Sequence, residues 1–111
     1  MGKLLPIGSI VYLKEGSQKL MILNRGPQIK PEEEVQIFDY SACLYPVGLV
    51  REKILYFNAE NVDRILFEGF TDEDEARFQE LYQQWLETEG KTFPKGKVDQ
   101  ALKAQELHED D

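Results

Sequence analysis

The pattern of apolar and polar residues along the first two thirds of the chain predicts short β-strands. Several runs are rich in β-branched and aromatic residues and are separated by Gly, Pro and polar residues. These runs cover positions 9–14, 19–24, 35–45, 51–57 and 62–67. Gly16 lies in a turn between the first two runs, which therefore form a predicted hairpin. Residues 25–34 are expected to be a loop, and residues 58–61 a single helical turn capped by Asn58.

The segment after these runs predicts an amphipathic helix from about residue 72 to about residue 89. Its apolar residues recur with the spacing of one helical face: Phe78, Leu81, Tyr82 and Trp85. Thr71 precedes Asp74 by three positions, which is the capping-box pattern with Thr71 as the N-cap. Gly90 is a suitable C′ residue, and Pro94 prevents a continuation of the helix.

Together these elements predict an α+β protein. Short strands joined by tight turns favour a small, strongly bent antiparallel sheet or a partly open barrel, with a flat meander as the alternative. A length of 111 residues fits one domain with a modest core. Residues 1–90 are expected to form this domain, with the helix packed on it. Residues 91–111 form a predicted tail, and Val98, Ala101 and Leu102 have the spacing of a short second helix.

The negative charge is concentrated in the predicted helix. The net charge is −8, and residues 71–90, with 1 basic and 7 acidic side chains, contribute −6 of it. Nucleic acid and anionic membranes are therefore poor partners, because clustered Lys and Arg bind them. Asp72, Glu73 and Glu75 suit the positive end of the helix dipole, and they could also contact a basic partner. With Tyr82 and Trp85 they are the candidate partner-binding residues, although an aromatic face more often packs into the core, which would bury Trp85.

The residues capable of catalysis or metal binding have simpler structural explanations. Cys43, the only thiol, lies between apolar residues in a predicted strand and is expected to be buried. His108, the only imidazole, lies in a charged tail whose carboxylates lack a fixed geometry. The glutamates at 32–34 are expected to form a solvated loop, and the polar residues at 58–63 a turn between strands. We therefore predict no metal, no cofactor and no enzymatic activity.

Several short motifs resemble those of one bacterial family. Near the N-terminus they are LPIGSIV at 5–11, LKEG at 13–16 and KLMI at 19–22. Further along they are DY at 39–40, CLYP at 43–46 with Gly48, FN at 57–58, VD at 62–63 and FEGF at 67–70. This combination, over about residues 4–70, resembles the family called domain of unknown function 4176. Its Gly and Pro positions are explained as turns, and none of its motif residues resembles a catalytic group.

The family occurs in Gram-positive bacteria, often beside genes for type VII secretion and its LXG-domain toxins. The resemblance therefore implies a non-catalytic accessory role, as an adaptor or chaperone that binds the helical targeting region of an LXG toxin. Two alternatives are an immunity protein that blocks a toxin's active site, and a small ligand-binding or enzymatic barrel. The sequence has no visible signal peptide and no apolar run of roughly 20 residues, so the cytoplasm is the expected compartment.

Overall fold

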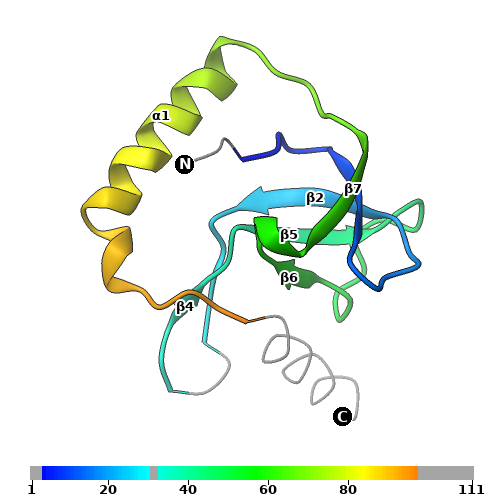
Figure 1. Cartoon of the computed structure of the whole chain (residues 1–111), viewed down its shortest axis with the longest axis horizontal. Coiled ribbons are helices and arrows are strands. Elements are labelled where there is room, and N and C mark those ends of the chain that lie inside the picture. The colour runs from blue at the N-terminus through cyan, green and yellow to red at the C-terminus, as the bar shows by residue number, and fades with distance from the viewer. Residues whose placement is uncertain (1–3, 31–32, 98–111) are drawn as a thin grey trace.

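The computed structural model describes residues 4–30 and 33–97, which form two antiparallel sheets and one α-helix (Figure 1). The larger sheet comprises β1 (Ile10–Leu13), β2 (Leu20–Arg25), β5 (Tyr40–Leu44), β6 (Leu55–Phe57) and β7 (Val62–Phe67). The smaller sheet comprises β3 (Gln28–Ile29) and β4 (Gln36–Ile37). The helices are η1 (Ala59–Asn61), α1 (Glu73–Glu87) and η2 (Gly90–Thr92). The predicted α+β class is confirmed.

The larger sheet is curled but open. Its strand order is β6-β5-β2-β1-β7, so β6 and β7 are its edges. In a flat sheet these edges would lie about 19 Å apart, because neighbouring strands are about 4.8 Å apart. Only residues 58–61 connect them, which reach about 17 Å when fully extended, and these residues include the compact turn η1. The sheet must therefore curl, yet the described strands do not close it, since β6 pairs with β5 and β7 pairs with β1.

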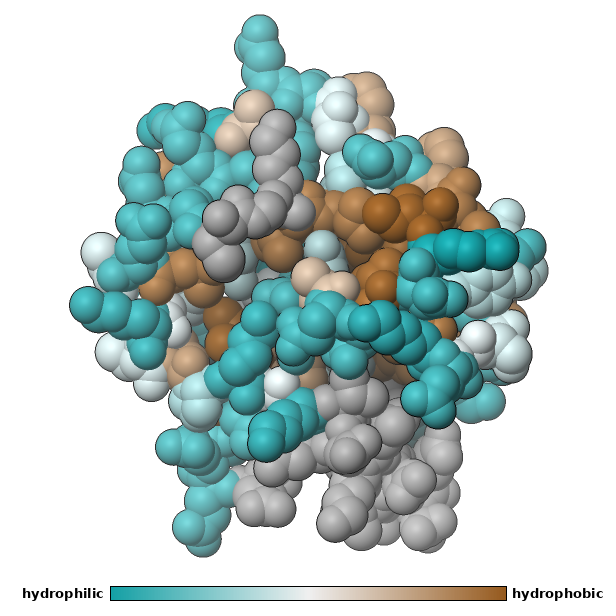
Figure 2. All heavy atoms as spheres, viewed as in Figure 1, coloured by the Kyte–Doolittle hydropathy of each residue, from teal (hydrophilic) through white to brown (hydrophobic). Residues whose placement is uncertain are grey.

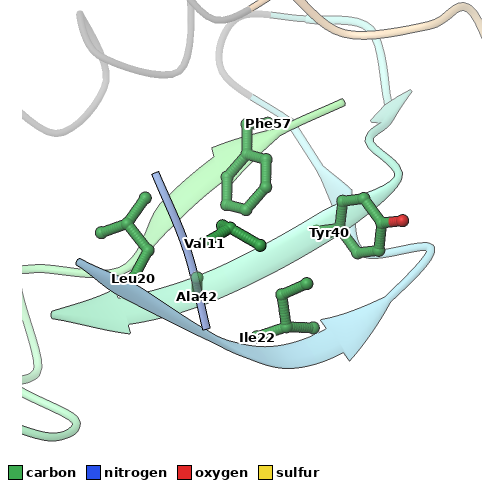
Figure 3. Close-up of a cluster of buried hydrophobic side chains, with 6 residues drawn as sticks. All are labelled: Val11, Leu20, Ile22, Tyr40, Ala42 and Phe57. Atoms are coloured by element: carbon green, nitrogen blue, oxygen red, sulfur yellow. The ribbon is translucent and has the colours of Figure 1, made fainter. Parts of the chain in front are cut away.

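The core lies on one face of this sheet, where side chains from four strands meet (Figure 3). Its buried members are at most 3% exposed: Val11, Leu20, Ile22, Tyr40, Ala42 and Phe57. Core residues that belong to the same strand are two positions apart, as Tyr40 and Ala42 are, because alternate side chains of a strand share a face. Cys43 is also buried, with 1% exposed, which confirms the prediction for the only thiol.

The predicted hairpin between residues 9–14 and 19–24 is confirmed by β1 and β2, in which Ile10 lies opposite Met21. The prediction for the next segment is wrong in two respects. Residues 25–34 are not wholly a loop, because they contain β3, and residues 35–45 form β4 and β5 rather than one strand.

The cause of these differences is a kink in one long hairpin. The main-chain ladder continues from β2–β5 into β3–β4, since Gly26 N donates to Asp39 O (2.9 Å) and Phe38 N donates to Pro27 O (3.0 Å). Gly26 has a φ of +69°, and Pro27 has no N–H to donate, so the long hairpin bends there and its strands divide into two sheets. On the opposite side, Asp39 N donates to the side chain of Asn58 (3.0 Å) instead of to a strand.

Helix α1 begins after Asp72, so the prediction of Thr71 as its N-cap is wrong. The Asp72 carboxylate accepts a hydrogen bond from Glu75 N (3.0 Å), as an N-cap side chain does. Gly90 is not the C′ residue of this helix either. It is buried at the start of η2, where an added Cβ would lie 2.7 Å from the Trp85 ring. No helix within residues 4–30 and 33–97 is long and apolar enough to span a membrane.

After η2 the chain returns to the smaller sheet (Figure 1). Lys95 forms a parallel bridge with Ile37. Ile37 N donates to Pro94 O (3.0 Å), and Gly96 N donates to Ile37 O (2.8 Å). The beginning of the predicted tail is thus attached to the sheet. The proposed second helix around Val98, Ala101 and Leu102 lies outside the described residues, as does His108.

Candidate functional site

The N-terminal arm, residues 4–9, runs between α1 and the larger sheet (Figure 1). Leu4 N donates to Gln79 Oε1 (3.2 Å), and Gln79 Nε2 donates to Leu4 O (2.8 Å). Leu5 N donates to the hydroxyl of Tyr40 (2.9 Å). Because Gln79 belongs to α1 and Tyr40 to β5, the arm connects the helix with the sheet.

A largely buried ion pair connects α1 with the end of β2. Arg25 Nη1 and Nη2 donate to the two carboxylate oxygens of Glu75, each at 2.7 Å, and the side chains are 4% and 15% exposed. Arg25 also donates to Leu5 O (3.0 Å), and its guanidinium lies 4.3 Å from the centroid of the Phe78 ring. The hydrogen bonds from Arg25, with a smaller contribution from Gln79, hold the pKa of Glu75 below its ordinary value against the effect of burial.

Two hollows flank the start of α1. The groove between the arm and the helix has a volume of about 570 Å³, and it is lined by apolar residues of the arm and by Glu68, Asp72 and Glu75. A second hollow of about 350 Å³ has Ile7, Phe70 and Phe78 among its apolar walls. It is also lined by three carboxylates, Asp72, Asp74 and Glu75, and by the one guanidinium of Arg25. Both hollows therefore combine apolar walls with negative charge.

Large apolar side chains are exposed along β7 and beside it. We call this surface the β7 patch: Ile7 (54% exposed), Ile65 (50%), Leu66 (40%), Phe67 (60%) and Phe70 (80%). Figure 2 shows apolar residues gathered over the arm and β7, with hydrophilic residues around them. Single exposed apolar residues are ordinary on a protein surface, whereas several on one edge strand and its flanks are typical of an interaction site.

The structure places the candidate partner-binding residues in two groups. Asp72, Glu73 and Glu75 lie in the cap and first turn of α1, beside the hollows. Asp72 caps the helix and Glu75 pairs with Arg25, so both carboxylates already have partners within the chain. Tyr82 and Trp85 lie further along the helix, away from these carboxylates.

Tyr82 and Trp85 belong to a row of four aromatic rings. The centroid distances are 5.7 Å from Phe78 to Tyr82, 5.9 Å from Tyr82 to Trp85 and 6.0 Å from Trp85 to Phe93. The expected packing of this face is confirmed only in part, because all four side chains are half-buried and α1 has no buried residue. The arm occupies space between helix and sheet.

The hydroxyl end of Tyr82 is close to the kink in the long hairpin. A Cβ added at Gly26 would lie 2.6 Å from the Tyr82 hydroxyl, so the absence of a side chain at Gly26 allows this approach. Burial, together with the nearby carboxylate of Asp39, raises the pKa of Tyr82 to about 12. The phenol is therefore neutral at physiological pH.

The polar residues at 58–63 include the expected helical turn, with Asn58 at its N-cap. Asn58 N donates to Asn61 Oδ1 (2.9 Å), and Asn58 Nδ2 donates to Gly96 O (2.9 Å). Lys95 Nζ lies 3.1 Å from Asp39 Oδ1. Asn58 and the ion pair between Lys95 and Asp39 thus fasten the segment after η2 to the sheet.

Sequence reasoning did not find the ion pair or the exposure of β7. Arg25 lies in a predicted loop, and Glu75 is 50 positions away, so no local pattern connects them. The sequence does contain a signal for the exposure of β7. Ile65, Leu66 and Phe67 are consecutive apolar residues, and a strand with one buried face can cover only alternate side chains.

The fold and surface define a small α+β domain with an open, curled sheet and an apolar patch on its edge. The chain belongs to the family described as a domain of unknown function, DUF4176, whose family profile matches residues 4–78. The matched region includes Arg25, Glu75 and the whole β7 patch, while Tyr82 and Trp85 lie beyond it. No match was found among curated proteins or among solved structures.

Proposed function

We propose that this protein is a non-catalytic accessory factor, an adaptor or chaperone, for an LXG-type toxin of a type VII secretion system. It binds the helical targeting region of the toxin in the cytoplasm before export. The observation that carries the proposal is the β7 patch, since exposed apolar residues gathered in this way are typical of protein interfaces. The class of partner is the one that the resemblance to this family implies.

The charges beside the β7 patch support a partner with basic residues. Glu68, Asp72 and Asp74 are exposed and lie beside Phe70 in the sequence. Complementary charge mainly accelerates encounter and improves specificity, while buried apolar residues supply most of the affinity. Higher salt should therefore slow association more than it accelerates dissociation.

Co-expression of the full chain with a neighbouring LXG protein, followed by size-exclusion chromatography, tests this proposal. The full chain should co-elute with the isolated targeting region. Phe70→Asp should weaken this complex by at least about tenfold, because it places a charge in the centre of an apolar contact. Val47→Asp is the matched control, since Val47 is 66% exposed in the β5–β6 connection and should leave the complex unchanged.

The alternatives give different results in this experiment. Co-elution with the isolated toxin domain, without binding to the targeting region, would show an immunity protein. Absence of binding to either region at concentrations well above micromolar would refute a binding role of either kind.

A further inference from the structure

We infer that the outer edge of β7 binds an extended segment of the partner, which joins the sheet as an additional antiparallel strand. This inference rests on the proposed function for the partner being a protein, and it places the contact with β7 in an extended segment of that partner rather than in its helices. In the described part of the chain β7 pairs with β1 alone. Its main-chain N–H and C=O groups that point away from β1 are therefore available to another strand.

The exposure of side chains on both faces of β7 favours a strand over a helix. Ile65 lies opposite Val11, so it is on the core face, and Phe67 lies opposite Ile10 on the other face. Ile65 is 50% exposed and Phe67 is 60% exposed, although Val11 is fully buried. A helix lying against one face would cover only one of these residues. An added strand would place neighbours beside both.

The second half of β7 lacks the charged residues and the proline that commonly protect a sheet edge. Edge strands commonly carry charged residues or proline, which prevent pairing with other chains. The first half has Asp63 and Arg64, and Arg64 also lies over the Tyr12 ring, 5.4 Å from its centroid. The three residues from Ile65 have neither charge nor proline. A register shift between Ile10 and Val11 makes Leu66 an extra residue on β7. Such a bulge leaves the extra residue unpaired with β1 and twists the edge locally, so an added strand must pair across a bend.

The surrounding charges specify the chemistry and direction of the segment. Glu68, Asp72 and Asp74 follow the C-terminal end of β7. An antiparallel segment would begin at this end, so basic residues should precede its apolar residues. A second copy of this chain is a poorer occupant, because each copy carries a net charge of −8.

A peptide-binding experiment with the full chain tests the inference. The probe is a labelled peptide with three lysines followed by alternating valine and threonine, and the control has the same residues in reversed order. The probe should bind more tightly than the control, as measured by fluorescence anisotropy. Binding should also slow the amide hydrogen exchange of Leu66, because its main chain becomes part of a strand pair.

Two substitutions identify the surface involved. Phe67→Lys should weaken peptide binding at least about tenfold, by removing an apolar contact at the edge. Glu68→Lys should weaken it about threefold, mainly through slower association. Leu49→Lys is the control, since Leu49 is 63% exposed in the β5–β6 connection and should not affect binding.

Three results would overturn the inference: unchanged exchange in β7, equal binding of both peptides, or unchanged binding by Phe67→Lys. A dimer that Phe67→Lys dissociates would also overturn it, because a second copy would then occupy the edge. If Phe67→Lys still forms the LXG complex, binding at the edge of β7 is refuted, while the proposed function is not. If the probe binds specifically but no LXG region binds, strand binding at the edge of β7 is supported and the proposed function is refuted.

Discussion

The ion pair between Arg25 and Glu75 should make a large contribution to stability. Glu75→Gln preserves the shape of the side chain but removes its charge, so the Arg25 guanidinium loses its only anionic partner among the described residues. Arg25 is 4% exposed, and its Nε already has no hydrogen-bond partner in the described structure. Water can therefore replace the lost bonds only poorly.

The expected loss follows from the burial of the pair. Removing one partner of a buried ion pair costs about 3–5 kcal/mol. We expect a loss in the free energy of unfolding at the lower end of this range, about 3 kcal/mol, because the Glu75 side chain is 15% exposed. For a domain of this size that loss lowers the Tm by about 12–24 °C, measured by circular dichroism. Combining Arg25→Leu with Glu75→Leu should recover much of the loss, because no unpaired charge is then buried.

A second ion pair on the same helix provides the control. Arg77 and Glu80 are 67% and 62% exposed and lie 3.2 Å apart. Glu80→Gln should change the free energy of unfolding by less than about 1 kcal/mol. If Glu75→Gln cost no more than Glu80→Gln, the argument from burial would be refuted.

The pH dependence of stability follows from the lowered pKa of Glu75. The folded pKa lies below the ordinary value of 4.5. The contribution of Glu75 is therefore fully present above about pH 4.5 and is lost as the pH falls through the folded pKa. The difference in stability between wild type and Glu75→Gln should shrink over this range. A constant difference would contradict the role of the charge.

Three further predictions concern buried and half-buried residues. Cys43 should react slowly with thiol reagents in the native protein and rapidly after unfolding, because the native side chain is buried; rapid native labelling would contradict this. Trp85→Ala should lower the free energy of unfolding by about 2 kcal/mol, less than for a fully buried Trp, with denaturant titration as the measurement. Gly96→Ala should cost about 1–3 kcal/mol in the same assay, because a Cβ would overlap the buried Phe38 ring; Gly16→Ala, at an exposed turn, is its comparison.

Features that depend on nearby residues could be predicted from the sequence. Periodicity located the first hairpin and α1, and the run around Cys43 indicated its burial. The position of the N-cap was wrong because Thr71 and Asp72 are adjacent and both side chains can cap a helix. Helix boundaries are set by small energy differences of this kind.

Features that depend on distant residues could not be predicted in this way. β3 has only two residues, and it is a strand because the β2–β5 ladder continues into it across the kink at Gly26. The attachment of α1 depends on the arm, whose Leu4 bonds to Gln79 across 75 positions, and helical periodicity contains no information on what covers a face. The candidate site is mostly of this kind, because Arg25, Glu75 and the arm meet only in the folded chain.

The attachment of α1 leads to a last prediction about local opening. α1 has no buried residue, and polar contacts from Gln79 and Glu75 together with half-buried rings attach it to the rest of the domain. The strands β2 and β5, by contrast, contain most of the buried core. Regions with few buried apolar contacts open at lower free energy than the core. Amide exchange of α1 should therefore be faster than that of β2 and β5 in the wild type, and Glu75→Gln should accelerate α1 further while changing the strands less. Equal protection of helix and strands, or equal acceleration of both by Glu75→Gln, would show that helix and sheet open as one unit and that the polar network does not control the helix separately.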